Sequence, residues 1–203
     1  MTQKDFFAQF LSEHFSDNRN VLLEQFERYH SWLVATNQKL NVISRQTDEA
    51  DIWTVHFLDS LLPVKYVDFS GCRILDFGTG GGLPGIPLAI AHGGAEVTLL
   101  DSRKKKIAAV KDAAACLGLG NCRFSDDRIE DFAGGAFDII VSRSVKIEPM
   151  YKPVLLKLLK PKGRLVLYKS RNLEDVQQFA GARIFDVSAG GEIGERRIVV
   201  VEN

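Results

Sequence analysis

The chain has 203 residues, 45% of them apolar, and equal numbers of acidic and basic side chains. This is enough for one domain with a full hydrophobic core and a decorated terminus. No apolar run approaches the roughly 20 residues needed to cross a membrane, and no basic stretch followed by an apolar one marks a signal peptide. The three cysteines are not in metal-binding spacing. We therefore expect a cytoplasmic monomer that binds neither a membrane nor a metal.

Residues 1–70 are predicted to form a helical cap. Apolar side chains recur at helical spacing in three stretches, over 6–15, 21–33 and 51–62. The third stretch ends at Pro63 and carries His56 and Asp59, which lie three residues apart and therefore on one face of the helix. That face could point at the ligand site. We nevertheless predict a structural role for both residues, because a histidine near an aspartate is more often a hydrogen-bonded pair than a catalytic one.

Beyond Arg73 the pattern changes to alternating strands and helices. Seven strands are expected, over 74–77, 96–101, 122–125, 137–142, 163–168, 184–187 and 198–201. Helices are expected over 103–117, 149–159 and 172–180. This alternation predicts a doubly wound, mostly parallel α/β sheet over residues 71–203.

A glycine-rich turn follows the first predicted strand, and we take it as the centre of the site. Five glycines fall within residues 78–85, and the motif is Asp76 followed by Gly78, Gly80 and Gly82. Glycine lets the chain turn through positive φ and lets a ligand approach the backbone closely. An acid two residues before the first glycine suits a cationic ligand rather than a pyrophosphate. S-adenosylmethionine carries an ammonium and a sulfonium and no phosphate, so it is favoured over a nicotinamide cofactor or a turn without a ligand.

Further candidate residues lie at the tips of the next strands, where open α/β sheets bind their ligands. Asp101 ends the second strand, 23 residues after Gly78. A carboxylate there can accept both ribose hydroxyls of the cofactor. In the acidic loop after the third strand, Glu130 can accept from the adenine amino group and Ile129 can pack on the ring.

Charge is unevenly distributed along the chain. Residues 143–171 carry nine basic side chains and one acidic one, Glu148. A basic segment beside a ligand site indicates a polyanionic substrate. A solvated helix face followed by a lysine-tipped turn explains the same pattern equally well.

Several motifs together resemble the bacterial 16S rRNA guanine-N7 methyltransferases, a family once called glucose-inhibited division protein B. The resemblance covers residues 20–201, and its most specific parts are Gly82–Leu88 and His56–Ser60. The other matching stretches are 40–44, 99–102, 128–132, 141–143, Lys169 and 195–200. Ser144 and Ser170 stand where the family commonly has alanine and often has glycine, respectively.

The resemblance implies a Rossmann-like class I methyltransferase fold and an acceptor in rRNA. The reaction would be methyl transfer from S-adenosylmethionine to N7 of one guanine, guanosine 527 in rRNA numbering. The partner would be 16S rRNA or a small-subunit particle. The residues that match the family's cofactor site are Gly78, Leu83, Ile129, Glu130 and Arg143. Candidate RNA contacts are Arg143, Lys160, Lys162, Lys169, Arg196 and Arg197.

The tip of the fourth strand agrees with N7 as the acceptor. It reads Ser142-Arg143-Ser144, whereas enzymes that methylate exocyclic amines usually place an Asn/Asp-Pro-Pro-aromatic motif there. Guanine N7 has an in-plane lone pair and no proton to remove, so positioning and electrostatics suffice. We therefore expect no acid or base, with Arg143 as the positioning residue. The alternatives are a methyltransferase of a small molecule or protein, and a non-catalytic RNA-binding module.

Overall fold

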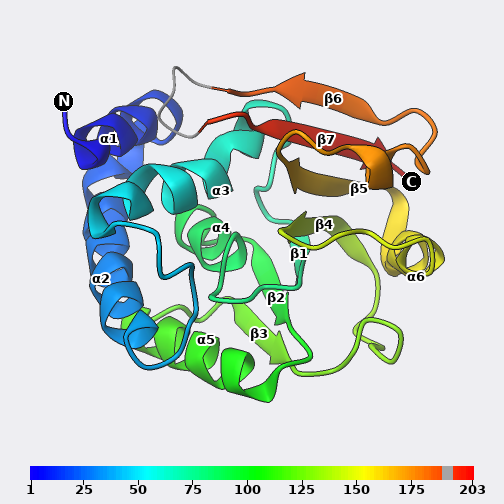
Figure 1. Ribbon diagram of the computed structural model, residues 1–203, viewed down its shortest axis with the longest axis horizontal. Coiled ribbons are helices and arrows are strands. Elements are labelled where there is room, and N and C mark those ends of the chain that lie inside the picture. The colour runs from blue at the N-terminus through cyan, green and yellow to red at the C-terminus, as the bar shows by residue number, and fades with distance from the viewer. Residues whose placement is uncertain (189–193) are drawn as a thin grey trace.

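A seven-stranded sheet forms the centre of the computed structural model, which describes residues 1–188 and 194–203 (Figure 1). The strand order is β3-β2-β1-β4-β5-β7-β6. β7 runs antiparallel to β5 and β6, and the other paired strands of the described chain are parallel. The predicted doubly wound, mostly parallel sheet is therefore confirmed. The strands are β1 (Arg73–Phe77), β2 (Glu96–Leu100), β3 (Cys122–Ser125), β4 (Phe137–Arg143), β5 (Leu159–Lys169), β6 (Arg183–Asp186) and β7 (Arg197–Glu202).

The central strands are apolar because both of their faces are covered. Ile74 and Leu75 of β1 pair with Ile139 and Ile140 of β4, and all four side chains are buried. Such continuous apolar runs are typical of parallel strands between two helical layers. Since β1, β2 and β4 are parallel neighbours, their carboxyl ends lie side by side at one edge of the sheet. This edge is where the site forms.

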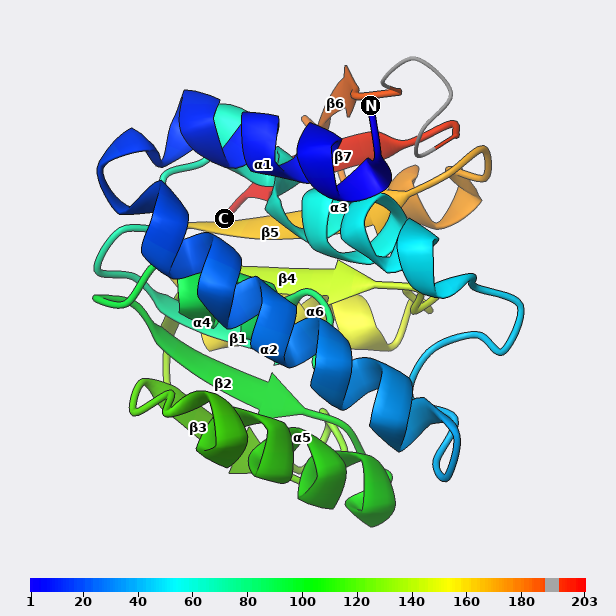
Figure 2. The same cartoon turned by 90° about the vertical axis from the view of Figure 1, so that its left-hand side faces the viewer.

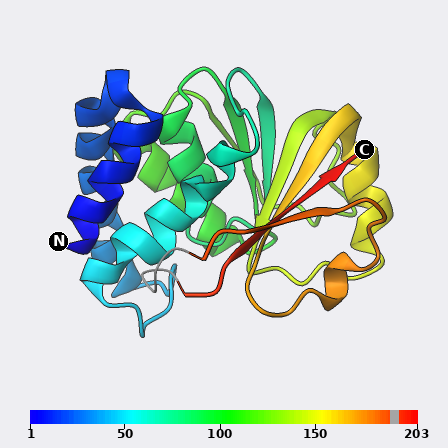
Figure 3. The same cartoon turned by 90° about the horizontal axis from the view of Figure 1, so that it is seen from above.

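The helices cover the two faces of the sheet unequally. The N-terminal helices lie on the same face as α4 and α5, whereas α6 lies on the other face (Figure 3). α2 contacts both α4 and α5 and crosses this side of the molecule (Figure 2). Within the described residues, no helix is long and apolar enough to cross a membrane. The helices are α1 (Gln3–His14), α2 (Arg19–Asn37), α3 (Asp59–Leu61), α4 (Gly85–Ala91), α5 (Lys104–Leu117) and α6 (Tyr151–Leu158).

The helical segment 1–70 shares its core with the sheet. Phe7, Phe26 and Phe57 are fully buried and belong to the same hydrophobic cluster as Ile74 of β1. The rings of Phe7 and Phe26 meet edge to face, with centroids 4.8 Å apart, which is a favoured aromatic geometry. The cap therefore packs as an extra layer on the α4–α5 side, and its boundary at residue 70 stays a prediction.

Three predicted elements differ in extent. The third helix begins with a π-helical turn, Ile52–Leu58, and continues past Pro63 in a 3₁₀ turn, Leu62–Lys65. Pro63 is tolerated because it occupies the first positions of that turn, where no backbone N–H is needed. β5 begins at Leu159, four residues earlier than predicted. The helix predicted over 172–180 is only a 3₁₀ turn, η5 (Glu174–Val176).

Candidate functional site

The carboxyl group of Asp76 anchors the glycine-rich turn by hydrogen bonds. This group is fully buried at the end of β1, where Oδ2 accepts hydrogen bonds from Thr79 Oγ1 at 2.6 Å and from Gly85 N at 2.8 Å. Burial raises the pKa of Asp76 to about 6, although both hydrogen bonds act in the opposite direction. Asp76 does not line the cavity described below. Its contact with the cofactor stays a prediction, since in this structure the carboxyl group points into the base of the loop.

The first two glycines of the motif need conformations that favour glycine. Gly78 has φ +78° and Gly80 has φ +58°, both in the left-handed region. A Cβ on Gly78 would also lie 2.4 Å from Cγ2 of Val145, which follows β4. The backbone at Gly78 is thus pressed against the segment after β4, with no room for a side chain.

Gly81 and Gly82 pack closely against the cap. Tyr29 of α2 is fully buried and donates a hydrogen bond to the carbonyl of Gly81 at 2.8 Å. A Cβ on Gly81 would lie 2.5 Å from the carbonyl oxygen of Val42, and one on Gly82 would lie 2.8 Å from the Tyr29 hydroxyl. Gly82 does not line the cavity and packs against the cap, and its contact with a cofactor stays a prediction. The cap fixes the shape of the turn.

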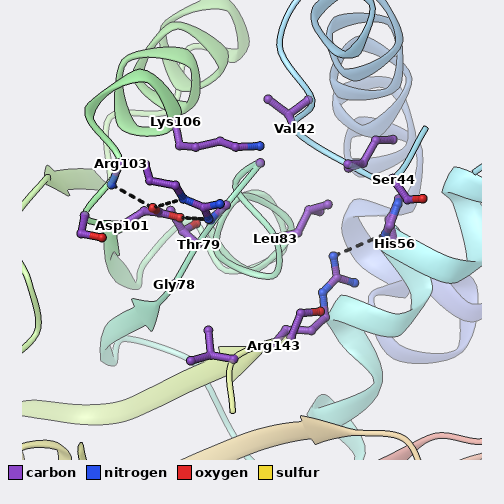
Figure 4. A pocket seen from close by; sticks show the side chains of 16 residues that line it. Val42, Ser44, His56, Gly78, Thr79, Leu83, Asp101, Arg103, Lys106 and Arg143 are labelled. Carbon is purple, nitrogen blue, oxygen red and sulfur yellow. Dashed lines mark hydrogen bonds and ion pairs between the residues drawn. The ribbon is translucent and has the colours of Figure 1, made fainter. Parts of the chain in front are cut away.

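A cavity of ≈ 540 Å³ opens above the carboxyl ends of β1, β2 and β4 (Figure 4). This volume lies within the range of about 300–1,000 Å³ that is typical of small-molecule sites. The cavity brings together the predicted residues Gly78, Gly80, Leu83, Asp101 and Arg143, and also His56. Its other lining residues are Val42, Ile43, Ser44, Thr79, Gly81, Ser102, Arg103, Lys106, Ser144 and Val145.

Asp101 is a preformed acceptor in the cavity wall. Its side chain is 4% exposed. Oδ2 accepts from Gly80 N at 3.0 Å and from Arg103 Nη2 at 2.8 Å, and Oδ1 accepts from Arg103 N at 3.0 Å and Arg103 Nε at 2.8 Å (Figure 4). Burial alone would raise the pKa of Asp101, but the hydrogen bonds and charge of Arg103 outweigh it and lower that pKa. Asp101 is therefore an ionised carboxylate, and both of its oxygens accept hydrogen bonds from Arg103.

A buried charge cluster joins the cap to the tips of the strands. Asp59 is fully buried, and its Oδ2 accepts a hydrogen bond from Arg143 Nη1 at 3.0 Å. Its Oδ1 lies 2.7 Å from Nε of Arg196, an ion pair that lacks hydrogen-bond alignment. Arg143 ends β4, and Arg196 directly precedes β7. One carboxylate of the helical segment thus binds both the arginine that ends β4 and the arginine that precedes β7, and the structural role of Asp59 stays a prediction.

His56 is neutral in this cluster. Its Nδ1 lies 3.4 Å from Arg143 Nη2, and its Nε2 is buried without a hydrogen-bond partner among the described residues. Burial, followed by the charges of Arg143 and Arg196, lowers the pKa of His56 to about 3. Because the arginine can only donate, Nδ1 is the acceptor and the proton is on Nε2. Arg143 is held in place by both His56 and Asp59.

Ile129 and Glu130 lie outside the cavity lining. Ile129 is 3% exposed and packs in the apolar cluster with Phe77 and Leu100. Glu130 is exposed and lines a separate surface hollow beside Phe132. The apolar side chain of Ile129 gains more by burial under the sheet than at the rim of a polar cavity. Their part in holding an adenine ring stays a prediction.

The basic segment 143–171 is divided between both edges of the sheet. Lys160 forms an ion pair with Asp138 at the start of β4, with Nζ 2.8 Å from Oδ1. Lys162 lies two residues further along β5, where its N–H donates to the carbonyl of Asn203. Parallel strands begin at this edge, so both lysines lie opposite the cavity. Their role as RNA contacts stays a prediction, and such contacts would lie away from the cavity.

The remaining predicted RNA contacts lie near the cavity edge of the sheet. Lys169 ends β5, is nine-tenths buried and pairs with Asp175. Arg197 begins β7 and donates from Nη1 to the carbonyl of Ser170 at 3.0 Å.

Two residues of the site were not identified from the sequence. Arg103 was missed as the hydrogen-bond donor to the Asp101 carboxylate, although it lies only two residues away in the sequence. The sequence also had no signal for Thr79, because a threonine in a turn is common.

The fold is that of the Rossmann-like class I S-adenosylmethionine-dependent methyltransferases. An S-adenosylmethionine-dependent methyltransferase from Aquifex aeolicus superposes with a TM-score of 0.62 at 18% identity, covering 74% of this chain and 92% of that one. An S-adenosylmethionine-dependent O-methyltransferase from Thermotoga maritima superposes with a TM-score of 0.59, also at 18% identity, covering 71% and 64%. At such identities the likeness concerns the fold alone.

Sequence comparison is more specific. A family model described as rRNA small subunit methyltransferase G matches residues 22–188. A ribosomal RNA small subunit methyltransferase G from Staphylococcus epidermidis is 33% identical over 98% of this chain and 89% of the relative. One from Chlorobium phaeobacteroides is 40% identical over 78% and 72%. The chain belongs to the rRNA small subunit methyltransferase G family, as its motifs predicted.

Proposed function

We propose that this protein transfers a methyl group from S-adenosylmethionine to N7 of guanosine 527 in 16S rRNA. The observation that carries the proposal is the cavity at the strand tips, where the Gly78–Gly81 backbone and the Asp101 carboxylate face Arg143 in a chain of this family. The runner-up functions are methylation of a small molecule or protein, and RNA binding without catalysis. The carboxylate of Asp101 is a preformed hydrogen-bond acceptor for a cofactor, and a module that only binds RNA would not need it.

The cavity residues fit the cofactor. Gly78 and Gly80 have no side chains and let a ligand lie against the backbone, and Leu83 offers an apolar contact. The ionised carboxylate of Asp101 can accept both ribose hydroxyls. S-adenosylmethionine supplies a methyl group on a positively charged sulfur, which keeps the electron pair of the carbon–sulfur bond when the methyl leaves.

The residues around the acceptor orient it and move no proton. Guanine N7 carries a lone pair and no hydrogen, so neither a base nor an acid is required. Arg143 is held by Asp59, so its guanidinium is a fixed donor at the edge of the cavity. His56 is neutral and its Nδ1 faces that guanidinium. This arrangement suits catalysis by positioning and electrostatics.

Arg103→Ala is expected to tighten cofactor binding. The ribose hydroxyls must compete with Arg103 for the two oxygens of Asp101. Because the arginine side chain is 65% exposed, the ion pair contributes only about 0.5–1 kcal/mol. The dissociation constant of S-adenosylhomocysteine, measured by calorimetry, should fall about two- to fivefold. Lys111→Ala on α5, the helix that Arg103 precedes, removes one charge away from the cavity and is the matched control. Weaker or unchanged binding by Arg103→Ala would refute this competition.

Single-turnover methyl transfer is expected to be nearly independent of pH between about 6.5 and 8, where an ordinary histidine base would titrate. His56 has already lost its proton far below this range, since its pKa is about 3. Asp76 takes up a proton only as the pH falls through about 6, so a decline below that value should reflect the loop.

The matched variant for the pH profile is His56→Gln. It should lose much less than the roughly 100-fold typical of a removed acid–base group, and it should keep the decline near pH 6. Rapid-quench measurements of both proteins over this pH range provide the comparison. A sigmoid centred near pH 6.5 that is lost in His56→Gln would identify His56 as a base.

Transfer of labelled methyl tests the proposed function. The protein is incubated with methyl-labelled S-adenosylmethionine and, separately, with small-subunit rRNA, small-subunit particles, total protein and a small-molecule extract. Label in rRNA or in the particles is the expected result. Label in protein or in a small molecule supports the runner-up enzymes. Cofactor binding without transfer to any of the four supports the binding module.

A further inference from the structure

A second cavity lies directly beside the first and shares one wall with it. The common wall is the segment Arg143–Val145 after β4, and the second cavity has a volume of ≈ 280 Å³. Ser144 in this wall has φ +62°, a strained value for a residue with a side chain, and such strain gathers at functional sites. The other lining residues are Lys146, Tyr168, Lys169, Ser170, Asn172, Glu174, Asp175 and Arg196.

We propose that this second cavity receives the base to be methylated and that Glu174 reads the Watson–Crick edge of guanine there. The inference rests on the proposed function and adds to it the site of the acceptor and the residue that selects it. An enzyme that acts on a nucleobase takes the base out of its stack and into a pocket, where side chains read its edges.

The position of the second cavity is the first argument. Methyl transfer requires the acceptor atom to lie in line with the donor at near-attack distance, so the acceptor must sit next to the cofactor. Of the cavities at this edge of the described sheet, the second one shares Arg143 with the proposed cofactor cavity. It has room for about nine water molecules at roughly 30 Å³ each, which is enough for one purine.

The distribution of charge in the cavity is the second argument. Guanine carries the acceptors N7 and O6 on one edge and the donors N1–H and N2–H₂ on its Watson–Crick edge. Arg143, common to both cavities, can donate to O6 while N7 faces the first cavity. Carboxylates come instead from the segment around η5, which supplies Glu174 and Asp175. A carboxylate facing N1–H and N2–H₂ accepts both, whereas adenine would turn the lone pair of its N1 toward it.

The two carboxylates are not equally available. Asp175 is nearly buried, and its Oδ2 accepts from Ile147 N at 2.8 Å and pairs with Lys169. Glu174 is exposed, and its side chain has only a long 3.5 Å contact with Nδ2 of Asn172 among the described residues. Its backbone N–H is fixed by Asn172 Oδ1 at 2.8 Å. Asp175 therefore anchors the turn, and Glu174 is the carboxylate that can turn to the base.

The first test fills the cavity. Ser170 is exposed and lines the second cavity but not the first, so Ser170→Trp should block the acceptor and spare the cofactor. Methyl transfer to small-subunit particles should fall at least 100-fold, while the dissociation constant of S-adenosylhomocysteine stays within twofold of the parent. Full methyl transfer by Ser170→Trp would overturn the inference, and so would an equal loss of cofactor binding.

The second test measures selection of the base. The substrate is a small-subunit particle with guanine or inosine at the target position, since inosine lacks the N2 amino group. The parent should prefer guanine in kcat/KM by about tenfold, and Glu174→Gln should lose most of that preference. Glu202→Gln, at the opposite edge of the sheet, is the matched control. An unchanged preference in Glu174→Gln would refute the role of Glu174. A parent that methylates no rRNA would refute the proposed function itself, and this inference with it.

Discussion

Asp59→Ala is expected to lower the free energy of unfolding by about 3–5 kcal/mol, the cost of removing one partner from a buried ion cluster. Asp59 is fully buried and is the carboxylate that contacts both Arg143 and Arg196. The side chains of these two arginines are 10% and 22% exposed, so they cannot regain their hydration without moving. Without the carboxylate, two like charges remain near each other in a medium that screens them poorly.

Urea unfolding, followed by circular dichroism, measures this loss. The control is Asp17→Ala, which removes an exposed carboxylate from the same helical part of the chain and should cost no more than about 0.5 kcal/mol. In addition, Arg196→Met should be much less costly in the Asp59→Ala background than alone, because the interaction it removes is already gone. Equal costs for Asp59→Ala and Asp17→Ala would contradict the cluster's role in joining the cap to the sheet.

Asp101→Ala is expected to weaken cofactor binding by about 1.5–3 kcal/mol, the scale of a charge-assisted hydrogen bond, which is roughly 10- to 150-fold in dissociation constant. Asp101 would accept the ribose hydroxyls, and it already accepts the N–H of Gly80, so its removal also loosens the turn. Calorimetry with S-adenosylhomocysteine measures the effect.

Two comparisons separate loss of the ribose contact from loss of a negative charge and from the effect of Arg103. Asp17→Ala controls for the loss of one negative charge and should bind like the parent. Asp101→Ala with Arg103→Ala should bind no better than Asp101→Ala, because Arg103 competes only while the carboxylate is present. If Asp101→Ala bound S-adenosylhomocysteine as tightly as the parent, the carboxylate would not be the ribose acceptor.

The alternation of strands and helices was enough to predict the sheet, since its central strands are apolar runs separated by turns. The tip positions of Gly78, Asp101 and Arg143 followed from the same alternation, because parallel strands bring their carboxyl ends to one edge. The direction of a side chain did not follow. Asp76 precedes the turn by two residues, as a ligand contact would, but its carboxylate faces the loop's own donors.

The basic segment shows a second limit of reasoning along the chain. Residues 143–171 contain the tip of β4, all of α6 and all of β5, so they begin at one edge of the sheet, pass the other and return. Lys160 and Lys162 lie among the first residues of β5, at the edge where a parallel strand must start. The predicted elements already contained this information, but counting charges over the whole segment concealed it.

The cluster around Asp59 could not be predicted from any local pattern. Asp59 and Arg143 are 84 residues apart, and the fold alone brings them within 3.0 Å. The spacing of His56 and Asp59 showed that they share a face, and it indicated no partner for that face. The second cavity likewise arises from segments of β4, β5, η5 and the residue before β7, which meet only in the folded chain.

Mapping of N7-methylguanine in 16S rRNA tests the central claim most directly. Small-subunit particles that lack the modification are incubated with the protein and S-adenosylmethionine, and the rRNA is cleaved chemically at N7-methylguanine and sequenced. The account predicts one new cleavage, at guanosine 527, that is absent without the protein and nearly absent with Ser170→Trp. Methyl groups at another atom or another nucleotide, or no methylation of rRNA by a protein that binds S-adenosylhomocysteine, would contradict it.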